Sequence, residues 1–197
     1  RDLIVTGVQT CALPIYYLDI PLQHIADPVL KRMNRQCDGK KVKDTLDMLK
    51  KEIPDISLRT NFIVGFPEET QKDFNELKKF VREYEFDNVG VFKYCPEEET
   101  AAYDMKQIPA KVKHERAAEL VEVQSRVIDR LNKRLIGAEL EAIADGETFG
   151  RTYKDAPDID GQVTFTKPVP AGCIFKARVV AAEGYRRTVE PLKIIKK

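Results

Sequence analysis

The chain has 197 residues and a formal net charge of +1, with 43% hydrophobic and 33% charged side chains. This length is sufficient for one or two domains with cores of their own. The near-zero net charge excludes a strong overall attraction to nucleic acid or membrane, and no run approaches the ~18 apolar residues of a membrane span. The 4 cysteines lie far apart, without metal-ligand or disulfide-framework spacing, so a cytoplasmic protein is expected.

The first 15 residues do not fit the pattern that follows. Val5 to Ile15 reads V-T-G-V-Q-T-C-A-L-P-I, which is the translation of a common sequencing adapter. Because so long a match does not arise by chance, residues 1–15 are interpreted as an adapter-derived artefact. The alternative is a genuine short strand. On the adapter interpretation, the natural protein begins upstream and this chain is its carboxyl-terminal part.

Strand and helix patterns alternate from residue 16 onward. A short strand is expected over Tyr16–Ile20, closed by Pro21. Asp27 and Pro28 then have the N-cap carboxylate and early proline of a helix start. A second helix with apolar residues at helical spacing follows Gly39.

The stretch Ser57–Thr70, S-L-R-T-N-F-I-V-G-F-P-E-E-T, organises this region. Its β-branched and aromatic residues predict a buried strand that ends in a sharp turn at Gly65. Thr70 and Asp73 resemble a capping box, so a helix should begin there. Ligand sites of α/β sheets lie at the carboxyl ends of strands. Gly65 therefore either lets the backbone approach a ligand or only forms a tight turn.

A third strand is expected over Asp87–Lys93, followed by a loop and a long helix that opens at Pro109 and ends at Gly137. Thereafter the sequence changes to short alternating segments separated by turn residues, over 138–144, 161–166 and 173–182. This pattern predicts a small barrel-like all-β domain of about five strands. The expected division is an α/β region over residues 16–136 and a β-barrel over 137–197.

Four segments, in the expected order, resemble the radical SAM methylthiotransferases. They are Y-L-D-I-P-L-Q-H at 17–24, V-L-K-R-M-N-R at 29–35, L-R-T-N-F-I-V-G-F-P-E-E-T at 58–70 and F-K-Y-C-P-E-E-E-T-A-A-Y at 92–103. The carboxyl-terminal β-domain resembles a TRAM domain. The resemblance implies an α/β plus all-β fold. Its parts are the last three strand–helix units of a partial (βα) radical SAM barrel with a linker helix, and a small TRAM β-barrel.

Three segments favour the RimO-type branch, which methylthiolates an aspartate of small-subunit ribosomal protein twelve. They are D-I-P-L-Q-H at 19–24, F-D-N-V-G-V-F-K-Y at 86–94 and G-R-T-Y-K-D-A-P-D-I-D-G at 150–161. One alternative is the MiaB-type branch, which modifies an adenosine of tRNA. Another, from a different class, is a non-catalytic TRAM module that binds nucleic acid. The expected partner is the ribosomal protein, with RNA through the TRAM domain as a second candidate and no membrane.

The resemblance implies S-adenosylmethionine and two 4Fe-4S clusters in the intact enzyme. Thiolates of a C-x-x-x-C-x-x-C motif hold the cluster that binds S-adenosylmethionine. This sequence has no such motif, and Cys37, Cys95 and Cys173 are too dispersed to replace it. The cluster ligands are therefore expected upstream, and the fragment itself should be inactive.

The resemblance also assigns cofactor-binding positions at the ends of the strands, namely Gln23, Arg35, Ile63, Gly65, Phe92 and Tyr94. A guanidinium at Arg35 suits a cofactor carboxylate, with a solvated helix-end charge as the alternative. Ile63 would offer adenine an apolar face and Gly65 its backbone. Phe92 would form a wall of the site or plain core. The neighbouring His24 is either part of the site or a structural histidine.

Two positions depart from the family pattern. In the usual turn G-F-P-G-E-T, Glu68 replaces the second glycine, and in the usual loop P-E-E-G-T, Glu99 replaces the glycine. If either position requires a positive φ, glutamate is strained there. The ending from Gly184 to Thr188 also departs from the family.

The β-domain has an uneven charge. Five basic and eight acidic side chains give −3 between Gly137 and Tyr185, whereas the tail from Arg186 carries +4. An acidic barrel suits a basic ribosomal protein better than RNA. The alternative is that Asp155, Asp158 and Asp160 only bond to the backbone of local turns.

Overall fold

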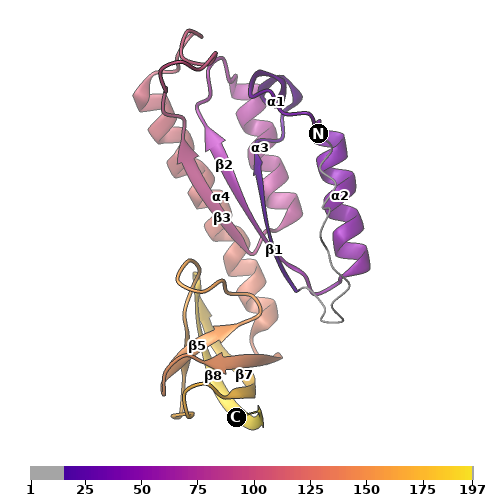
Figure 1. Cartoon of the computed structure of the whole chain (residues 1–197), viewed down its shortest axis with the longest axis vertical. Coiled ribbons are helices and arrows are strands. Elements are labelled where there is room, and N and C mark those ends of the chain that lie inside the picture. Colours follow the sequence, from indigo (N-terminus) through magenta and orange to yellow (C-terminus); the bar gives the residue numbers. More distant parts are fainter. Residues whose placement is uncertain (1–15, 197) are drawn as a thin grey trace.

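The computed structural model describes residues 16–196 (Figure 1), so the adapter interpretation of residues 1–15 lies outside the described residues. A parallel sheet with its helices forms one end of the molecule, and a closed barrel forms the other. The first part contains β1 (Tyr17–Gln23), α1 (Asp27–Arg32), α2 (Gly39–Glu52), β2 (Ser57–Val64), α3 (Gln71–Tyr84), β3 (Asn88–Lys93) and α4 (Ala110–Leu135). The barrel contains β4 (Glu139–Ala144), β5 (Phe149–Thr152), β6 (Val163–Phe165), β7 (Ile174–Glu183) and β8 (Arg186–Lys196).

The three strands of the sheet are parallel and lie in sequence order, β1-β2-β3, as predicted. The expectation that Pro21 closes the first strand is wrong, because β1 continues to Gln23. β1 lies at one end of the strand order, and its pairing with β2 is irregular between Ile20 and Gln23. A proline is tolerated at such a place because its missing N–H breaks no regular ladder bond.

The helix starts follow the sequence in part. The capping box of Thr70 and Asp73 is present at the start of α3, as predicted. The N-cap assigned to Asp27 is wrong, since Ala26 is the N-cap of α1. The Asp27 carboxylate instead accepts a hydrogen bond from the Gly39 amide at 2.7 Å, which joins α1 to the first residue of α2.

The core of the first part lies between the sheet and its helices. Alternate residues of β2 are buried there, and Phe62 packs edge-on against Phe80 and Phe86 at ring distances of 6.2 and 6.0 Å. Helices α2, α3 and α4 contribute Leu46, Leu77 and Leu120 to the same cluster. The other residues of β2, including Ile63, face the opposite side of the sheet and are only half-buried.

Glu68 and Glu99 both lie in the left-handed region, with φ values of 61° and 65°. These are the two positions at which the family pattern has glycine. Both positions therefore have the positive φ at which glutamate was expected to be strained. This conformation costs a residue with a side chain roughly 1 kcal/mol relative to glycine.

Glu68→Gly and Glu99→Gly are each expected to stabilise the protein, by up to about 1 kcal/mol or a Tm increase of roughly 2–4 °C. Relief of the positive φ outweighs the extra chain entropy that glycine gives the unfolded state. Thermal unfolding followed by circular dichroism measures the change. The control is Glu98→Gly, because Glu98 is not among the described residues with positive φ. Equal behaviour of all three variants would contradict the prediction.

The barrel closes in the order β4-β5-β6-β8-β7. Its interior holds Phe165 and Phe175, whose rings meet edge-on at 5.0 Å, together with Val163 and Val189. The treatment of Arg186 onward as a basic tail is wrong. These residues form β8, which pairs with both β6 and β7 and closes the barrel.

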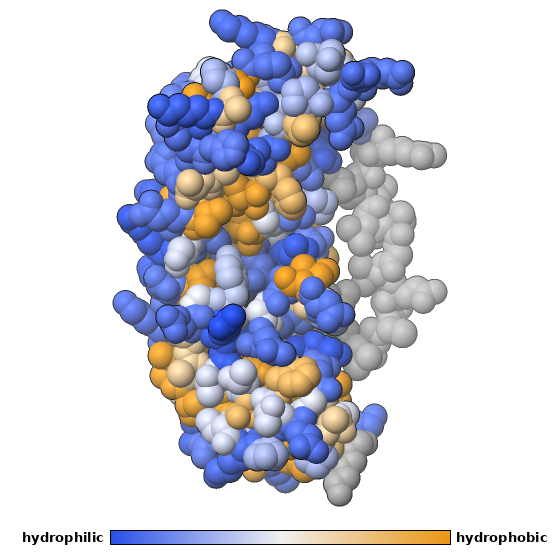
Figure 2. Space-filling model, turned by 90° about the vertical axis from the view of Figure 1, so that its left-hand side faces the viewer, coloured by the Kyte–Doolittle hydropathy of each residue, from blue (hydrophilic) through white to orange (hydrophobic). Residues whose placement is uncertain are grey.

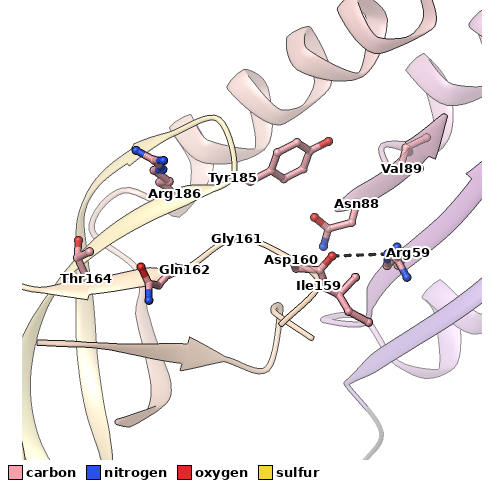
Figure 3. A pocket seen from close by; sticks show the side chains of 11 residues that line it. Arg59, Asn88, Val89, Ile159, Asp160, Gly161, Gln162, Thr164, Tyr185 and Arg186 are labelled. Atoms are coloured by element: carbon pink, nitrogen blue, oxygen red, sulfur yellow. Dashed lines mark ion pairs between the residues drawn. The ribbon is translucent and has the colours of Figure 1, made fainter. Parts of the chain in front are cut away.

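The barrel contacts the sheet through the segment between β5 and β6. Figure 3 shows Asp160 of this segment facing Arg59 of β2, at 3.5 Å between Oδ1 and Nε. The other oxygen of Asp160 accepts hydrogen bonds from the Tyr17 hydroxyl at 2.6 Å and from the Ala156 amide. Lys154 pairs with Asp87 at 2.9 Å. These contacts join the barrel to the amino-terminal ends of the strands.

Two of the eight acidic residues counted for an acidic barrel face, Asp155 and Asp160, are therefore not free to meet a partner. Asp155 is buried and paired with Arg187, and Asp160 is bonded within the junction. The alternative, in which these aspartates bond to local turns, describes Asp155 better. Its carboxylate also accepts hydrogen bonds from the amide and hydroxyl of Thr152.

Two tyrosines make stability sensitive to alkaline pH. Burial, and then the bond to Asp160, raise the pKa of Tyr17 well above its ordinary value of 10.0. Burial, and then Asp47, raise the pKa of Tyr84 to about 12. Because the folded-state pKa values are raised, this stabilisation is complete below pH ~10 and is lost as pH rises further. Urea unfolding should give a stability that falls from pH ~10 to ~12 and falls less steeply in Tyr17→Phe/Tyr84→Phe. An equal slope in the two proteins would contradict this.

None of the helices within residues 16–196 is long and apolar enough to cross a membrane. On the face viewed in Figure 2, apolar areas are separated by hydrophilic ones over the sheet part and the barrel alike.

Candidate functional site

A cleft of about 490 Å³ lies at the carboxyl ends of the three parallel strands. Five of the six residues assigned to the cofactor from the sequence line it, namely Gln23, Arg35, Ile63, Phe92 and Tyr94. They come from the ends of β1, β2 and β3 and from the segments that follow β3 and α1. The strand ends bring them together because parallel strands present their carboxyl ends at one edge of the sheet.

The wall of the cleft formed by β2 and β3 is apolar and aromatic. Ile63 and Phe92 are register partners on the two strands. Phe92 is 56% exposed, so the alternative that it is plain core is wrong. Tyr94 packs edge-on against Phe66 with ring centroids 4.8 Å apart. This wall offers a flat apolar surface of the kind that accepts an aromatic ring.

Cations also line the cleft. Arg35 and Lys93 are exposed and Arg32 is partly buried, and the sequence did not single out Arg32 or Lys93. Arg32 is partly engaged, because it donates to the Glu68 carbonyl at 3.1 Å and lies 3.8 Å from Asp73. Arg32 and Arg35 belong to the same R-M-N-R segment. Their spacing in the sequence therefore does not show whether one or both of them line the cleft. These guanidiniums could hold the carboxylate of an amino acid.

Gly65 is not part of the cleft lining. Its φ is +73°, and a Cβ at this position would lie 2.4 Å from Cγ of Lys113, in the first turn of α4. The Lys113 ammonium donates to the Tyr94 carbonyl at 2.9 Å and lies 5.0 Å from the centre of the Tyr94 ring. The glycine is therefore required by the turn and by the lysine side chain that supports Tyr94.

The loop after Tyr94 brings a run of carboxylates to the cleft. Glu97 lines it, and Glu98 and Glu99 follow. Within residues 16–196, none of the three forms an ion pair. The loop that follows Tyr94 is therefore negatively charged where it borders the cleft.

His24 lies beneath the cleft and has no exposed surface. Its Nδ1 accepts a hydrogen bond from the Ala26 amide at 3.0 Å, so a neutral ring carries its proton on Nε2. The structural alternative for His24 is therefore favoured over direct contact with a ligand.

A second cleft, of about 770 Å³, lies between the amino-terminal ends of the strands and the barrel (Figure 3). It is lined by Arg59, Asn88, Ile159 and Asp160 among others, and by none of the six predicted residues. Within residues 16–196, no three histidine, cysteine or acidic side chains gather as they would around a metal ion.

Two domain families match the chain. The radical SAM superfamily matches residues 13–81, and the TRAM domain matches residues 136–187. The first match covers β1 and β2, which supply much of the carboxyl-end cleft, and the second covers most of the closed barrel. Among solved structures, coproporphyrinogen III oxidase of Escherichia coli, described as a radical SAM enzyme, is 23% identical with a TM-score of 0.49. That comparison covers 57% of this chain and 27% of the other.

Curated relatives named ribosomal protein uS12 methylthiotransferase RimO match most of the chain. That of Elusimicrobium minutum is 47% identical over 175 residues, covering 87% of this chain and 41% of the relative. That of Geobacter sulfurreducens is 46% identical over 178 residues, covering 86% and 40%. That of Aquifex aeolicus is 42% identical over 192 residues, covering 91% and 44%. The chain thus spans about two-fifths of the length of these relatives, and it resembles them along both its radical SAM part and its TRAM barrel.

Proposed function

We propose that this chain is the carboxyl-terminal part of a cytoplasmic enzyme that methylthiolates an aspartate of ribosomal protein uS12. The observation that carries the proposal is the cleft at the carboxyl ends of β1, β2 and β3, around which five residues of separate sequence motifs gather. In this proposal residues 16–136 are the end of the radical SAM barrel with its linker helix. Residues 137–197 are the TRAM domain, and residues 1–15 are an adapter-derived artefact.

The groups that line the cleft suit the parts of S-adenosylmethionine. Ile63, Phe92 and Tyr94 would hold the adenine on the apolar wall, and Arg35 would bind the carboxylate. Gln23 would donate a side-chain hydrogen bond between them. When bound to a 4Fe-4S cluster and reduced, this cofactor supplies a 5′-deoxyadenosyl radical. In this proposal the ligands of both clusters belong to a part of the enzyme that precedes the chain.

The charge of the loop after Tyr94 supports a basic protein substrate over tRNA. Glu97, Glu98 and Glu99 repel a phosphate backbone and attract lysine and arginine side chains. Arg32, Arg35 and Lys93 also line the cleft, so this argument depends on the loop alone.

Titration with uS12 and with tRNA, at low and moderate salt, tests this choice. We expect weak binding of uS12 that declines as salt rises, and no measurable binding of tRNA. Glu97→Lys/Glu98→Lys should abolish binding of uS12. The matched control is Glu52→Lys/Glu76→Lys, which makes the same change in charge on exposed helix positions away from the cleft. Binding of tRNA in preference to uS12 would move the assignment to the MiaB-type branch.

RNA binding by the barrel is a second candidate, favoured by one observation. Lys176 and Lys193 are register partners on β7 and β8, and both side chains are exposed. Binding of RNA abolished by Lys176→Glu/Lys193→Glu, but not by the cleft variants, would support this candidate.

A further inference from the structure

The backbone is strained at Gln23, which lines the cleft. Its φ is +69°, although glutamine has no preference for the left-handed region. The His24 amide donates to the Leu22 carbonyl at 2.9 Å, so residues 22–24 form a γ-turn with positive φ at its centre. Such a turn persists only where the surrounding structure enforces it, and this strain is typical of functional sites.

His24, which follows the strained turn, is held on one side by a hydrogen bond and faces a buried carboxylate on the other. His24 is fully buried, and its Nδ1 accepts from Ala26, the N-cap of α1. Its Nε2 points toward Oε1 of Glu69 at 3.9 Å, and the Glu69 side chain has no exposed surface. The two atoms have no hydrogen-bond partner among the described residues.

The Glu69 carboxylate also reaches the end of β2 and the start of α4. Its Oε2 accepts a hydrogen bond from the Gly65 amide and lies 3.4 Å from the guanidinium of Arg116. Arg116 also donates to the Glu69 carbonyl at 3.0 Å. A buried charge held in this way is strongly disfavoured unless its partners stay in place. The ends of β1 and β2 are therefore tied to one carboxylate.

From this geometry we infer that Glu69 is a positioning residue for the cleft, acting with His24 and Arg116. It fixes the ends of β1 and β2 relative to one another, and so holds Gln23 in its strained turn beside Ile63. This inference rests on the proposed function only where it concerns the cofactor. The positional role itself can be measured without any ligand.

Amide hydrogen exchange of the 197-residue chain tests the positional role. Glu69→Gln preserves the size of the side chain but removes its charge, and Arg116→Lys is a milder second variant. In both, exchange of the Gly65 amide should become roughly tenfold to a hundredfold faster, because its hydrogen bond to the charged carboxylate is weakened. The His24 amide, which donates to the Leu22 carbonyl, should also exchange faster, because the turn is no longer held in place. The control is Gln124→Leu, which removes another buried polar side chain of α4, bonded to the Phe86 carbonyl.

Gln124→Leu should leave the Gly65 and His24 amides protected, whatever its effect on thermal stability. Unchanged exchange at these amides in Glu69→Gln, or equal acceleration in the control, would overturn the inference.

Equilibrium dialysis with labelled S-adenosylmethionine separates the positioning role of Glu69 from the assignment of the cofactor to the cleft. If the wild-type chain binds it, Glu69→Gln should bind at least about tenfold more weakly and Gln124→Leu should bind normally. Equal binding by wild type and Glu69→Gln would overturn the positioning role in cofactor binding. If the wild-type chain does not bind, the cofactor assignment fails, and the exchange measurement still decides whether Glu69 positions the turn.

Discussion

Arg187→Met is expected to lower the free energy of unfolding of the barrel by about 3–5 kcal/mol, because it leaves a buried carboxylate without its cation. The Arg187 guanidinium lies 2.6 Å from Oδ1 of Asp155, and the two side chains are 4% and 2% exposed. Asp155 in turn holds the Thr152 amide and hydroxyl, so the pair joins β8 to the end of β5. Urea unfolding followed through barrel resonances measures the loss.

The exposed pair of Arg178 and Glu139 provides the control. Its side chains are 46% and 49% exposed, so Arg178→Met should cost at most about 1 kcal/mol. A loss of similar size in the two variants would show that Arg187 is not held in the buried pair, and β8 would then be less important to the barrel than the structure indicates.

Gly65→Ala is expected to destabilise the chain by about 2–4 kcal/mol, for two separate reasons. The residue has a φ of +73°, and its added Cβ would lie 2.4 Å from Cγ of Lys113. That carbon is close to the backbone of α4, so it cannot move away without shifting the helix or the Tyr94 carbonyl that Lys113 binds. Chemical denaturation gives the free energy of unfolding.

Two further variants separate the strain from the clash. Gly172 has a φ of +83° and would meet nothing within 4 Å, so Gly172→Ala measures the strain alone, at roughly 1 kcal/mol. Lys113→Ala should make Gly65→Ala less harmful, since it removes the obstructing carbon. A cost for Gly65→Ala no larger than that for Gly172→Ala would contradict the close approach of α4.

The strands and helices of the sheet part could be predicted because local signals agree with the fold. The capping box of Thr70 and the apolar run before Gly65 each specify their element without help from distant residues. Pro21 misled the prediction because its tolerance depends on the place of β1 in the sheet, which no local pattern reveals.

The residues that line the cleft could be predicted from the sequence, but the contacts that hold them in place could not. Gln23, Ile63 and Phe92 end strands, so their gathering follows from parallel topology alone. The γ-turn at Gln23 has no local sequence signal, and the partner of Glu69, Arg116 of α4, lies far along the chain.

The prediction of an acidic barrel surface from a sum of charges also depended on contacts that the sequence does not reveal. A sum over the sequence does not show that Asp155 is internally paired or that Asp160 faces the sheet. β8 was missed because its partners β6 and β7 close the barrel through long-range pairing, and its alternation is interrupted by Pro191.

In the proposed function, S-adenosylmethionine binds in the cleft at the carboxyl ends of the strands, and not in the second cleft between the strands and the barrel. Ile63 lines the first and Ile159 lines the second, so their methyl resonances report on the two clefts in one experiment. Titration of methyl-labelled protein with S-adenosylmethionine should shift the Ile63 signal in a saturable way and leave the Ile159 signal unchanged. A saturable shift of Ile159 without Ile63, or no shift of either signal, would contradict the assignment.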